Sequence, residues 1–240
     1  MKKLLTIIVS FLLFINVMDA QGLLEKGKAL AKAASNSTGG FSKEEAAKAI
    51  KESLVNGTNS GTEEVSRPDG YFKNPEIKIP FPEDAKTVEQ KLRSIGAGAK
   101  VDEAILSINR AAELAGKEAK PIFISAIKQM TVTDAINIVK GEEDAATRYL
   151  DKTTNTMLYE KFKPIIASAL EKTGATKHWT TVFSTYNKIP LVKKVNPDLE
   201  DYATRKAIVG LFVMIAKEEK KIRQDPIART SDLLKKVFGG

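Results

Sequence analysis

The stretch KPIFISAI, residues 120–127, returns as KPIIASAL at residues 163–170, an offset of 43 residues. A weaker third copy, KAIVG, begins at Lys206 and has alanine in place of the proline. Periods of about 40 to 47 residues are typical of stacked helical pairs, in which each pair buries its apolar face against the next. Proline suits the first turn of a helix, so both Lys-Pro sites predict a helix start or a kink. The sequence therefore predicts an all-α fold, either a multi-helix bundle or stacked helical pairs.

One long segment departs from the helical pattern. Residues 67–82, RPDGYFKNPEIKIPFP, contain four prolines, and every second residue from Ile77 to Phe81 is apolar. The prolines preclude a helix and disfavour a central strand, so we expect an extended Pro-rich strap with one apolar face. Long irregular segments in compact domains are often functional. The strap is therefore either a cover for the helical core or a binding loop, and the aromatic residues Tyr71 and Phe72 serve either role.

The first 20 residues have the pattern of a secretory signal peptide. Lys2 and Lys3 precede an apolar run from Leu4 to Val17, and Ala20 offers a small residue for cleavage. The run is shorter than the ~20 apolar residues that a membrane span needs. We therefore expect an exported protein, periplasmic or secreted, with no transmembrane segment in the mature chain. Residues 21–41 are expected to form a short N-terminal segment and flexible linker, and residues 42–240 a single helical domain.

Three local patterns predict helix ends. Ser42 and Glu45 have the spacing of a capping box, which predicts a helix over residues 43–55. The run NGTNSGT, residues 56–62, is rich in glycine and asparagine and is expected to interrupt that helix. Asn196 precedes a proline and is expected to be the N-cap of the last long helix.

The composition bounds the chemistry. The chain carries 38 Lys and Arg against 30 Asp and Glu, with signs mixed along its length, which is typical of a solvated surface. The absence of cysteine excludes disulfides, thiol catalysis and the lipid anchor of a bacterial lipoprotein. The aromatic residues are scattered and form no base-stacking platform, so we expect no nucleic-acid partner. His178 is the single histidine, and we expect no metal site and no cofactor.

The candidate ligand-binding residues are polar groups at helical spacing together with the aromatic pair of the strap. They are Tyr71, Phe72, Asn109, Arg110, Glu113, Asp144, Arg148 and Asp151. Glu113 with Asp144 or Asp151 could instead supply an acid and a base for a hydrolase or lyase. Helix caps and surface ion pairs account for the same carboxylates without chemistry.

Four runs carry a resemblance to a known family. They are RPDGYFKNPEIKIPFP, NRAAELAGKEAKPIF, GEEDAATRYL and ARTSDLLKKVFGG. The chain resembles, from about Ser42 to Gly240, the uncharacterised bacterial family catalogued as domain of unknown function 4197. The resemblance implies a mostly exported, largely helical protein and supplies no catalytic residues.

The leading hypothesis from the sequence is an exported, non-enzymatic envelope protein. It would bind a small molecule, an envelope polymer or a protein partner through the strap and the polar helix face. One alternative is the carboxylate-based hydrolase or lyase. A second is a structural protein with weak membrane-surface contact, although the apolar residues of the segment from Leu233 to Phe238 are more simply explained by docking on the body.

Overall fold

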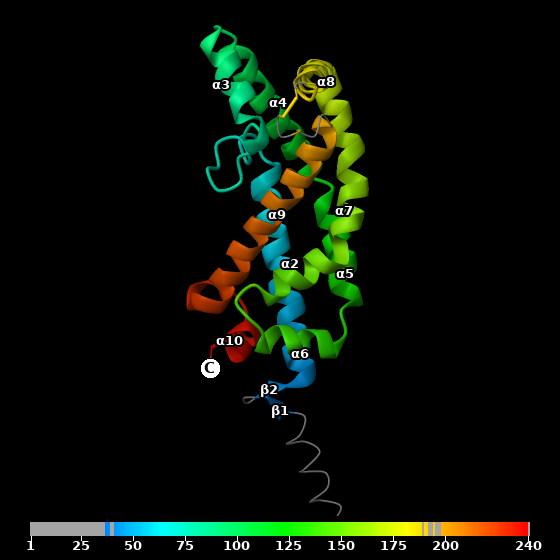
Figure 1. Ribbon diagram of the computed structural model, residues 1–240. Coiled ribbons are helices and arrows are strands. Elements are labelled where there is room, and N and C mark those ends of the chain that lie inside the picture. The colour runs from blue at the N-terminus through cyan, green and yellow to red at the C-terminus, as the bar shows by residue number, and fades with distance from the viewer. Residues whose placement is uncertain (1–36, 39–40, 189, 192–193, 195–197, 240) are drawn as a thin grey trace, which may run out of the picture.

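The computed structural model describes residues 37–38, 41–188, 190–191, 194 and 198–239. The predicted signal peptide and most of the segment after it lie outside these residues. The described part is an elongated multi-helix bundle, as Figure 1 shows, and the all-α prediction is confirmed. A short antiparallel hairpin of β1 (Ser37–Thr38) and β2 (Phe41–Ser42) precedes the first long helix.

Five helices form the body of the bundle. They are α2 (Lys43–Ser66), α4 (Gly98–Gly116), α5 (Ala119–Gln129), α7 (Ala145–Lys172) and α9 (Leu199–Gln224). Helix α9 packs against α2, α4 and α7, and α7 packs against α4 and α5. Apolar residues at helical spacing meet in this core, for example Phe123 of α5 and Phe212 of α9, whose ring centroids are 5.6 Å apart.

Shorter elements close the two ends. The upper end in Figure 1 carries η1 (Glu83–Ala85), α3 (Lys86–Ser94) and α8 (Ala175–Tyr186). The lower end carries α6 (Val132–Lys140), η2 (Pro226–Ala228) and α10 (Asp232–Phe238). Leu234 and Val237 of α10 are buried in a small second core with Ala46, Ala49 and Ile222. The apolar side of this last helix therefore docks on the body, as the sequence favoured.

The predicted interruption of the first long helix is wrong, because α2 runs without a break through residues 56–62. The Ser42–Glu45 capping box starts it as expected. Gly57 and Gly61 face α9, and a Cβ on Gly61 would lie 3.2 Å from Ile215 Cγ1. The small residues thus let two long helices approach closely. The packing gained against α9 outweighs the low helix propensity of glycine.

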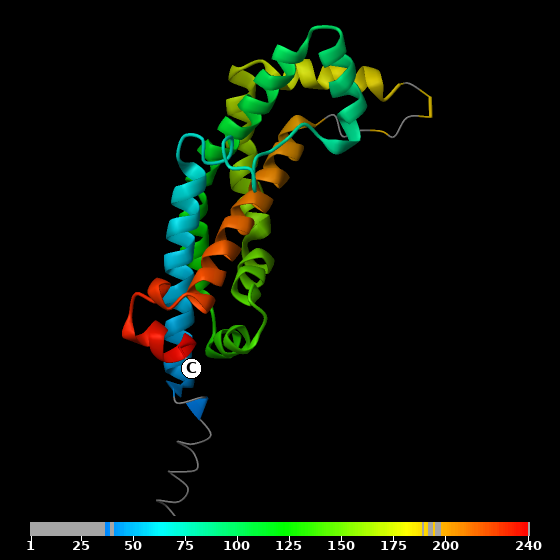
Figure 2. The ribbon, with the colours of Figure 1, turned by 90° about the vertical axis from the view of Figure 1, so that its left-hand side faces the viewer.

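The 43-residue echo does not correspond to stacked pairs. Pro121 lies in the first turn of α5, as predicted, whereas Pro164 lies inside α7. Helix α5 descends towards α6 and α7 rises from that end, so the two run in opposite directions (Figures 1 and 2). Equivalent helices of a stack run parallel, so the bundle is the correct alternative. The shared pattern reflects the apolar spacing that any core-facing helix needs.

The last long helix starts later than expected. Its N-cap is Asp198, whose Oδ1 accepts a hydrogen bond from the Asp201 amide at 2.9 Å. The prediction of Asn196 as N-cap is therefore wrong. Aspartate and asparagine are about equally good caps, so local sequence alone does not separate two candidates two residues apart.

Candidate functional site

The strap leaves α2 through a tight turn. The Gly70 amide donates to the Arg67 carbonyl at 3.0 Å, and Asp69 has a φ of +67°. A Cβ on Gly70 would lie 2.3 Å from the carbonyl oxygen of Glu64, so a side chain does not fit there. The turn therefore fixes the direction in which the strap departs from the helix.

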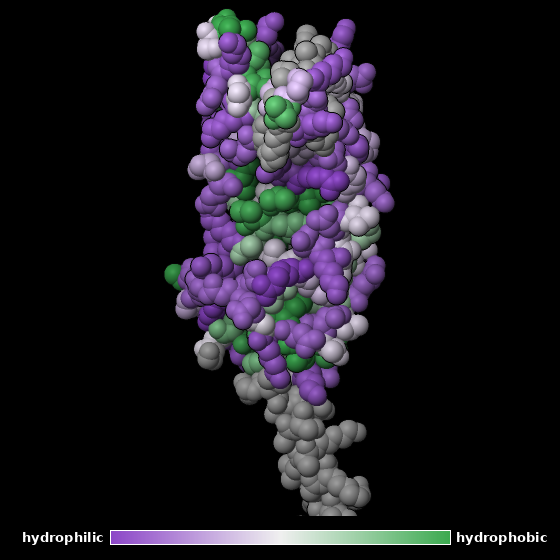
Figure 3. All heavy atoms as spheres, in the orientation of Figure 1, coloured by the Kyte–Doolittle hydropathy of each residue, from purple (hydrophilic) through white to green (hydrophobic). Residues whose placement is uncertain are grey.

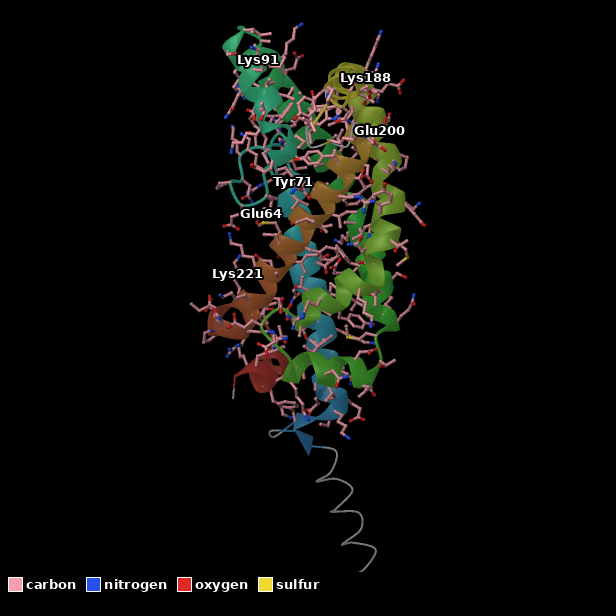
Figure 4. All side chains as sticks on the ribbon, viewed as in Figure 1. Glu64, Tyr71, Lys91, Lys188, Glu200 and Lys221 are labelled. Atoms are coloured by element: carbon pink, nitrogen blue, oxygen red, sulfur yellow. The ribbon has the colours of Figure 1, made fainter. Side chains whose placement is uncertain are left out.

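Tyr71 docks the strap on α9, beside which it lies in Figure 4. Its side chain is completely buried, and its hydroxyl donates to the Ala207 carbonyl at 2.6 Å. A Cβ on Gly210 would lie 2.7 Å from the tyrosine Cε1, so the ring occupies the space above that glycine. Burial raises the pKa of the phenol well above its usual value. The ring is therefore a neutral, hydrogen-bonded anchor.

Glu113 of α4 holds the backbone of the strap. One carboxylate oxygen accepts the amides of Tyr71 and Phe72, each at 3.2 Å, and the other accepts Arg110 Nη1 at 2.7 Å. Arg110 Nη2 also donates to Asp69 Oδ1 at 2.6 Å. The side chains of Lys73 and then Arg110 lower the pKa of Asp69. A chain of charge-assisted contacts thus ties the turn to α4.

Asn109 holds the far part of the strap. Its Oδ1 accepts the Ile79 amide at 2.9 Å, and its Nδ2 donates to the Ile79 carbonyl at 2.8 Å. This buried amide satisfies both backbone groups of one strap residue, as a neighbouring strand would. Ile79, the residue that Asn109 holds, lies two residues before Phe81. The centroid of the Phe81 ring is 5.0 Å from that of Trp179 and 5.8 Å from that of Phe183.

The structure brings one group of predicted site residues together and leaves another apart. Five of them lie at the contact between strap and α4: Tyr71, Phe72, Asn109, Arg110 and Glu113. The other three lie on or next to the first turns of α7. Arg148 Nη1 pairs with Asp144 Oδ1 at 2.5 Å, and Asp151 Oδ1 accepts from Asn155 Nδ2 at 2.6 Å. The first group attaches the strap to α4. The apolar face of the strap covers the core.

A second buried glutamate escaped the sequence reasoning. Glu219 of α9 accepts the amides of Ala146 and Thr147 at 3.0 and 2.8 Å and pairs with Arg223 at 2.8 Å. It caps α7 from another helix, much as Glu113 holds the strap. The only sequence signal is a glutamate four residues before an arginine, which is also common on exposed helix faces.

A groove lies at the end of the strap, at the upper end of the bundle. Its volume is about 480 Å³, within the range of small-molecule sites. Phe81 contributes from the strap, and α3, α4, the end of α7 and α8 supply the rest. The lining residues are Phe81, Leu92, Ala97, Lys100, Val101, Glu103, Ala104, Ser107, Thr173, Ala175, Lys177, Trp179 and Phe183.

Aromatic side chains build one wall of the groove. Trp179 and Phe183 of α8 have ring centroids 4.5 Å apart, and Tyr202 of α9 stacks on Trp179 at 6.2 Å. The Tyr202 hydroxyl donates to the Pro80 carbonyl at 2.9 Å. Within the described part of the chain, the buried indole nitrogen of Trp179 has no hydrogen-bond partner. A buried N–H group without a partner destabilises the fold by about 1–3 kcal/mol. A hydrogen bond is therefore not the reason why the indole lies at this position.

The rim of the groove carries three charged residues. Lys100 and Glu103 are exposed on α4, and neither forms an ion pair with another described residue. Lys177 lies on α8. The N-cap of α4, Ala97, provides no side-chain hydrogen bond, and the first turn of that helix contains no acidic residue. The positive end of the α4 dipole therefore lies beside Lys100, with no carboxylate in the first turn of the helix to offset it.

Another apolar feature is exposed on α9. Figure 3 shows an apolar area over the middle of that helix on a mostly hydrophilic face. Val209 and Val213 are 58% and 39% exposed there. This is the convex surface of one helix, whereas a small-molecule site needs a concavity. The groove is therefore the better candidate site.

The family follows from the extent of one match. The family model described as "Protein of unknown function (DUF4197)" matches residues 40–239. The chain belongs to this family. The match covers the strap, the bundle and the groove of this DUF4197 protein, and it confirms the resemblance seen in the sequence. No curated protein and no solved structure matches the chain.

The described residues of the DUF4197 protein contain neither a metal-binding cluster nor a single membrane-spanning helix. No group of three or more His, Cys, Asp or Glu side chains is placed there to hold a metal ion. No single helix in the same ranges is long and apolar enough to cross a membrane. Helices α5 and α6 meet the length and composition test only as a pair bent by 103°.

Proposed function

We propose that this DUF4197 protein is exported, is not an enzyme, and binds a small, largely apolar ligand in the groove at the end of the strap. The observation that carries the proposal is the groove itself, a concavity of about 480 Å³ walled by Phe81, Trp179 and Phe183. Apolar and aromatic walls with a few polar groups at the edge are typical of small-molecule sites. The signal-peptide pattern supports the export.

The contacts of the carboxylates favour binding over catalysis. A hydrolase of the kind considered above needs Glu113 and Asp144 or Asp151 in one cleft. Glu113 is buried and accepts two strap amides and Arg110, while the two aspartates have their polar contacts on α7. Each carboxylate thus has a structural contact of its own, and none of the three lines the groove.

A purely structural or membrane-surface role has less support. The segment considered for membrane contact, Leu233–Phe238, lies within α10, and Leu234 and Val237 are buried against α2 and α9. Helix α10 therefore uses its apolar side within the protein. The groove, by contrast, is a concave apolar surface that the bundle does not fill.

Intrinsic fluorescence tests the proposal, because Trp179 is the only tryptophan of the chain and it lines the groove. We expect primary alcohols from octanol to hexadecanol to change its emission on binding. The affinity should rise by up to about fourfold for each methylene and level off when the groove is full. A ligand elsewhere would leave the emission of this buried indole unchanged.

A pair of matched variants locates the site. Ala104→Phe fills the groove and should abolish the fluorescence response. Ala216→Phe places the same ring at another half-buried alanine, on α9 and outside the groove, and should preserve it. The proposal is wrong if no chain length binds, or if both variants bind as the wild type does.

A further inference from the structure

We infer that the ligand of the groove is a single-chain anionic amphiphile, with its apolar chain under Phe81 and its charged head beside Lys100. This inference rests on the proposed function and adds the chemical class of the ligand. The groove is divided in the way that such a molecule requires. The aromatic residues that line it are buried, and the three charged residues that line it are exposed.

The first argument is the position of Lys100. The residue lies in the first turn of α4, where the aligned peptide dipoles give the helix a partial positive charge. A lysine there is unfavourable for the helix, and no carboxylate of the first turn compensates. An anion bound at this point would interact favourably with both the ammonium group and the helix dipole. The same turn lines the groove through Ala97 and Val101.

The second argument is that another helix begins at the same groove. Ala175 and Lys177 lie in the first turn of α8, and both line the cavity. The positive ends of two helices and two lysines therefore border one concavity. Lys177 contributes a positive charge to this border. An ammonium group has three donors, so it can contact a bound anion in addition to another acceptor.

Glu103 is the one acidic residue among those that line the groove. It lies one turn further along α4 than Lys100 and is exposed. The lining thus has two positive charges and one negative charge. A negative head is favoured at the N-terminal end of α4 and disfavoured beside Glu103, which orients the ligand. The removal of Glu103 should therefore strengthen the binding of anions.

The wall fits the other half of the molecule. Phe81, Trp179 and Phe183 are among the lining residues and are almost completely buried. Leu92 and Ala104 add aliphatic surface from α3 and α4. An alkyl chain can lie against such a wall without leaving a polar group unpaired, and it gains from each methylene removed from water.

The test compares four ligands with one chain length and different heads, each titrated below its micellar concentration. Dodecanoate and dodecyl phosphate are anionic, dodecanol is neutral, and dodecylamine is cationic. We expect both anions to bind about five- to tenfold more tightly than dodecanol, which corresponds to one exposed ion pair plus a helix dipole. Dodecylamine should bind most weakly, and added salt should reduce the differences.

Three variants assign the head to its place. Lys100→Gln should remove most of the preference for anions and leave the affinity for dodecanol unchanged. Glu103→Gln should increase the preference. The control is Lys206→Gln, which removes an exposed lysine of α9 that lies outside the groove and has no ion pair with a described residue. This variant should bind all four ligands as the wild type does.

The outcomes separate the inference from the proposal beneath it. Equal binding of dodecanol and dodecanoate would overturn the anionic head while leaving the apolar groove intact. A complete absence of binding by all four would overturn both. Equal affinities for the two anions would support a site for negative charge of either source, and a marked preference for dodecyl phosphate would support a phosphate head such as that of a lysophospholipid. Retention of the anion preference in Lys100→Gln would overturn the assignment of the head.

Discussion

Glu113→Ala is the most direct test of how the strap is held. The carboxylate accepts the amides of Tyr71 and Phe72 and one nitrogen of Arg110, and alanine accepts none of these. Among the described residues, no other group accepts a hydrogen bond from these two amides. The substitution should therefore destabilise the protein through unpaired backbone groups rather than through lost apolar contacts.

The magnitude follows from the burial of each donor. The Tyr71 amide belongs to a fully buried residue, and its desolvation without a partner costs about 1–3 kcal/mol. The Phe72 amide is only partly buried, and the half-exposed Arg110 keeps its contact with Asp69, so each adds roughly 0.5–1 kcal/mol. The sum is about 2–5 kcal/mol. Glu113→Gln keeps one acceptor oxygen and should cost about half as much.

Urea unfolding monitored by circular dichroism measures the effect, and amide hydrogen exchange locates it. We expect the amides of Tyr71 and Phe72 to lose protection in Glu113→Ala before the rest of the bundle does. Glu103→Ala is the control, because Glu103 is exposed on the same helix and makes no ion pair with a described residue. Similar unfolding midpoints for the two alanine variants would refute the reasoning.

Three other predictions follow from separate features. Lys73 and Arg110 lower the pKa of Asp69, so its charged form stabilises the fold above about pH 4, and this contribution is lost as the pH falls further. Asparagine also tolerates the positive φ at this position, so Asp69→Asn should reduce the pH dependence of the unfolding midpoint over that acid range. Gly210→Ala should lower the free energy of unfolding in urea by about 1–3 kcal/mol, because its Cβ would lie 2.7 Å from Tyr71 Cε1. Val209→Ala, at the exposed residue just before it, should change that free energy by less than about 0.5 kcal/mol. The intact mass of protein from its native host should correspond to a chain without residues 1–20, and a species that retains Met1 would contradict export by this leader.

The sequence was sufficient to predict those features that depend on only a few neighbouring residues, such as helix caps and the inner face of the strap. The capping box at Ser42 has both of its reciprocal hydrogen bonds. The same three-residue spacing recurs at Thr131 and Asp134, which form a second capping box at the start of α6. The alternating residues Ile77, Ile79 and Phe81 are all buried, so the period of two identified the inner face of the strap.

The features that depend on another helix were not readable. Residues 56–62 look like a loop until α9 is present to pack against the glycines. Glu113 and Glu219 resemble the exposed glutamates around them, and only the approach of a distant backbone distinguishes them. The sequence did place Glu113 on a face with Asn109 and Arg110. It did not reveal that the partners of this face would be the amides of the strap.

The groove was hidden for the same reason. Its walls come from five parts of the chain, and only the bundle topology brings the start of α4 and the start of α8 to the same end. The sequence predicted a binding surface made of the strap and the polar helix face, whereas the groove lies at the end of the strap, beside Phe81. Neither Lys100 nor Trp179 was predicted to be a site residue. A lysine in the first turn of a helix and a tryptophan within a helix are common in sequences, and only the structure shows that these two line one groove.

The anchors of the strap give it a role in the groove although most of the strap does not touch it. From α2 onward the chain is held at Tyr71 by Glu113 and α9, at Ile79 by Asn109, and at Pro80 by Tyr202. The next residue is Phe81, which is part of the groove wall. Because α4 and α9 carry the anchors, and α4 also lines the groove, the position of the Phe81 ring is fixed relative to the opposite wall. Loosening of the strap should therefore weaken ligand binding without removal of any group that contacts the ligand, and the polar face first considered as a binding surface would act by positioning that wall.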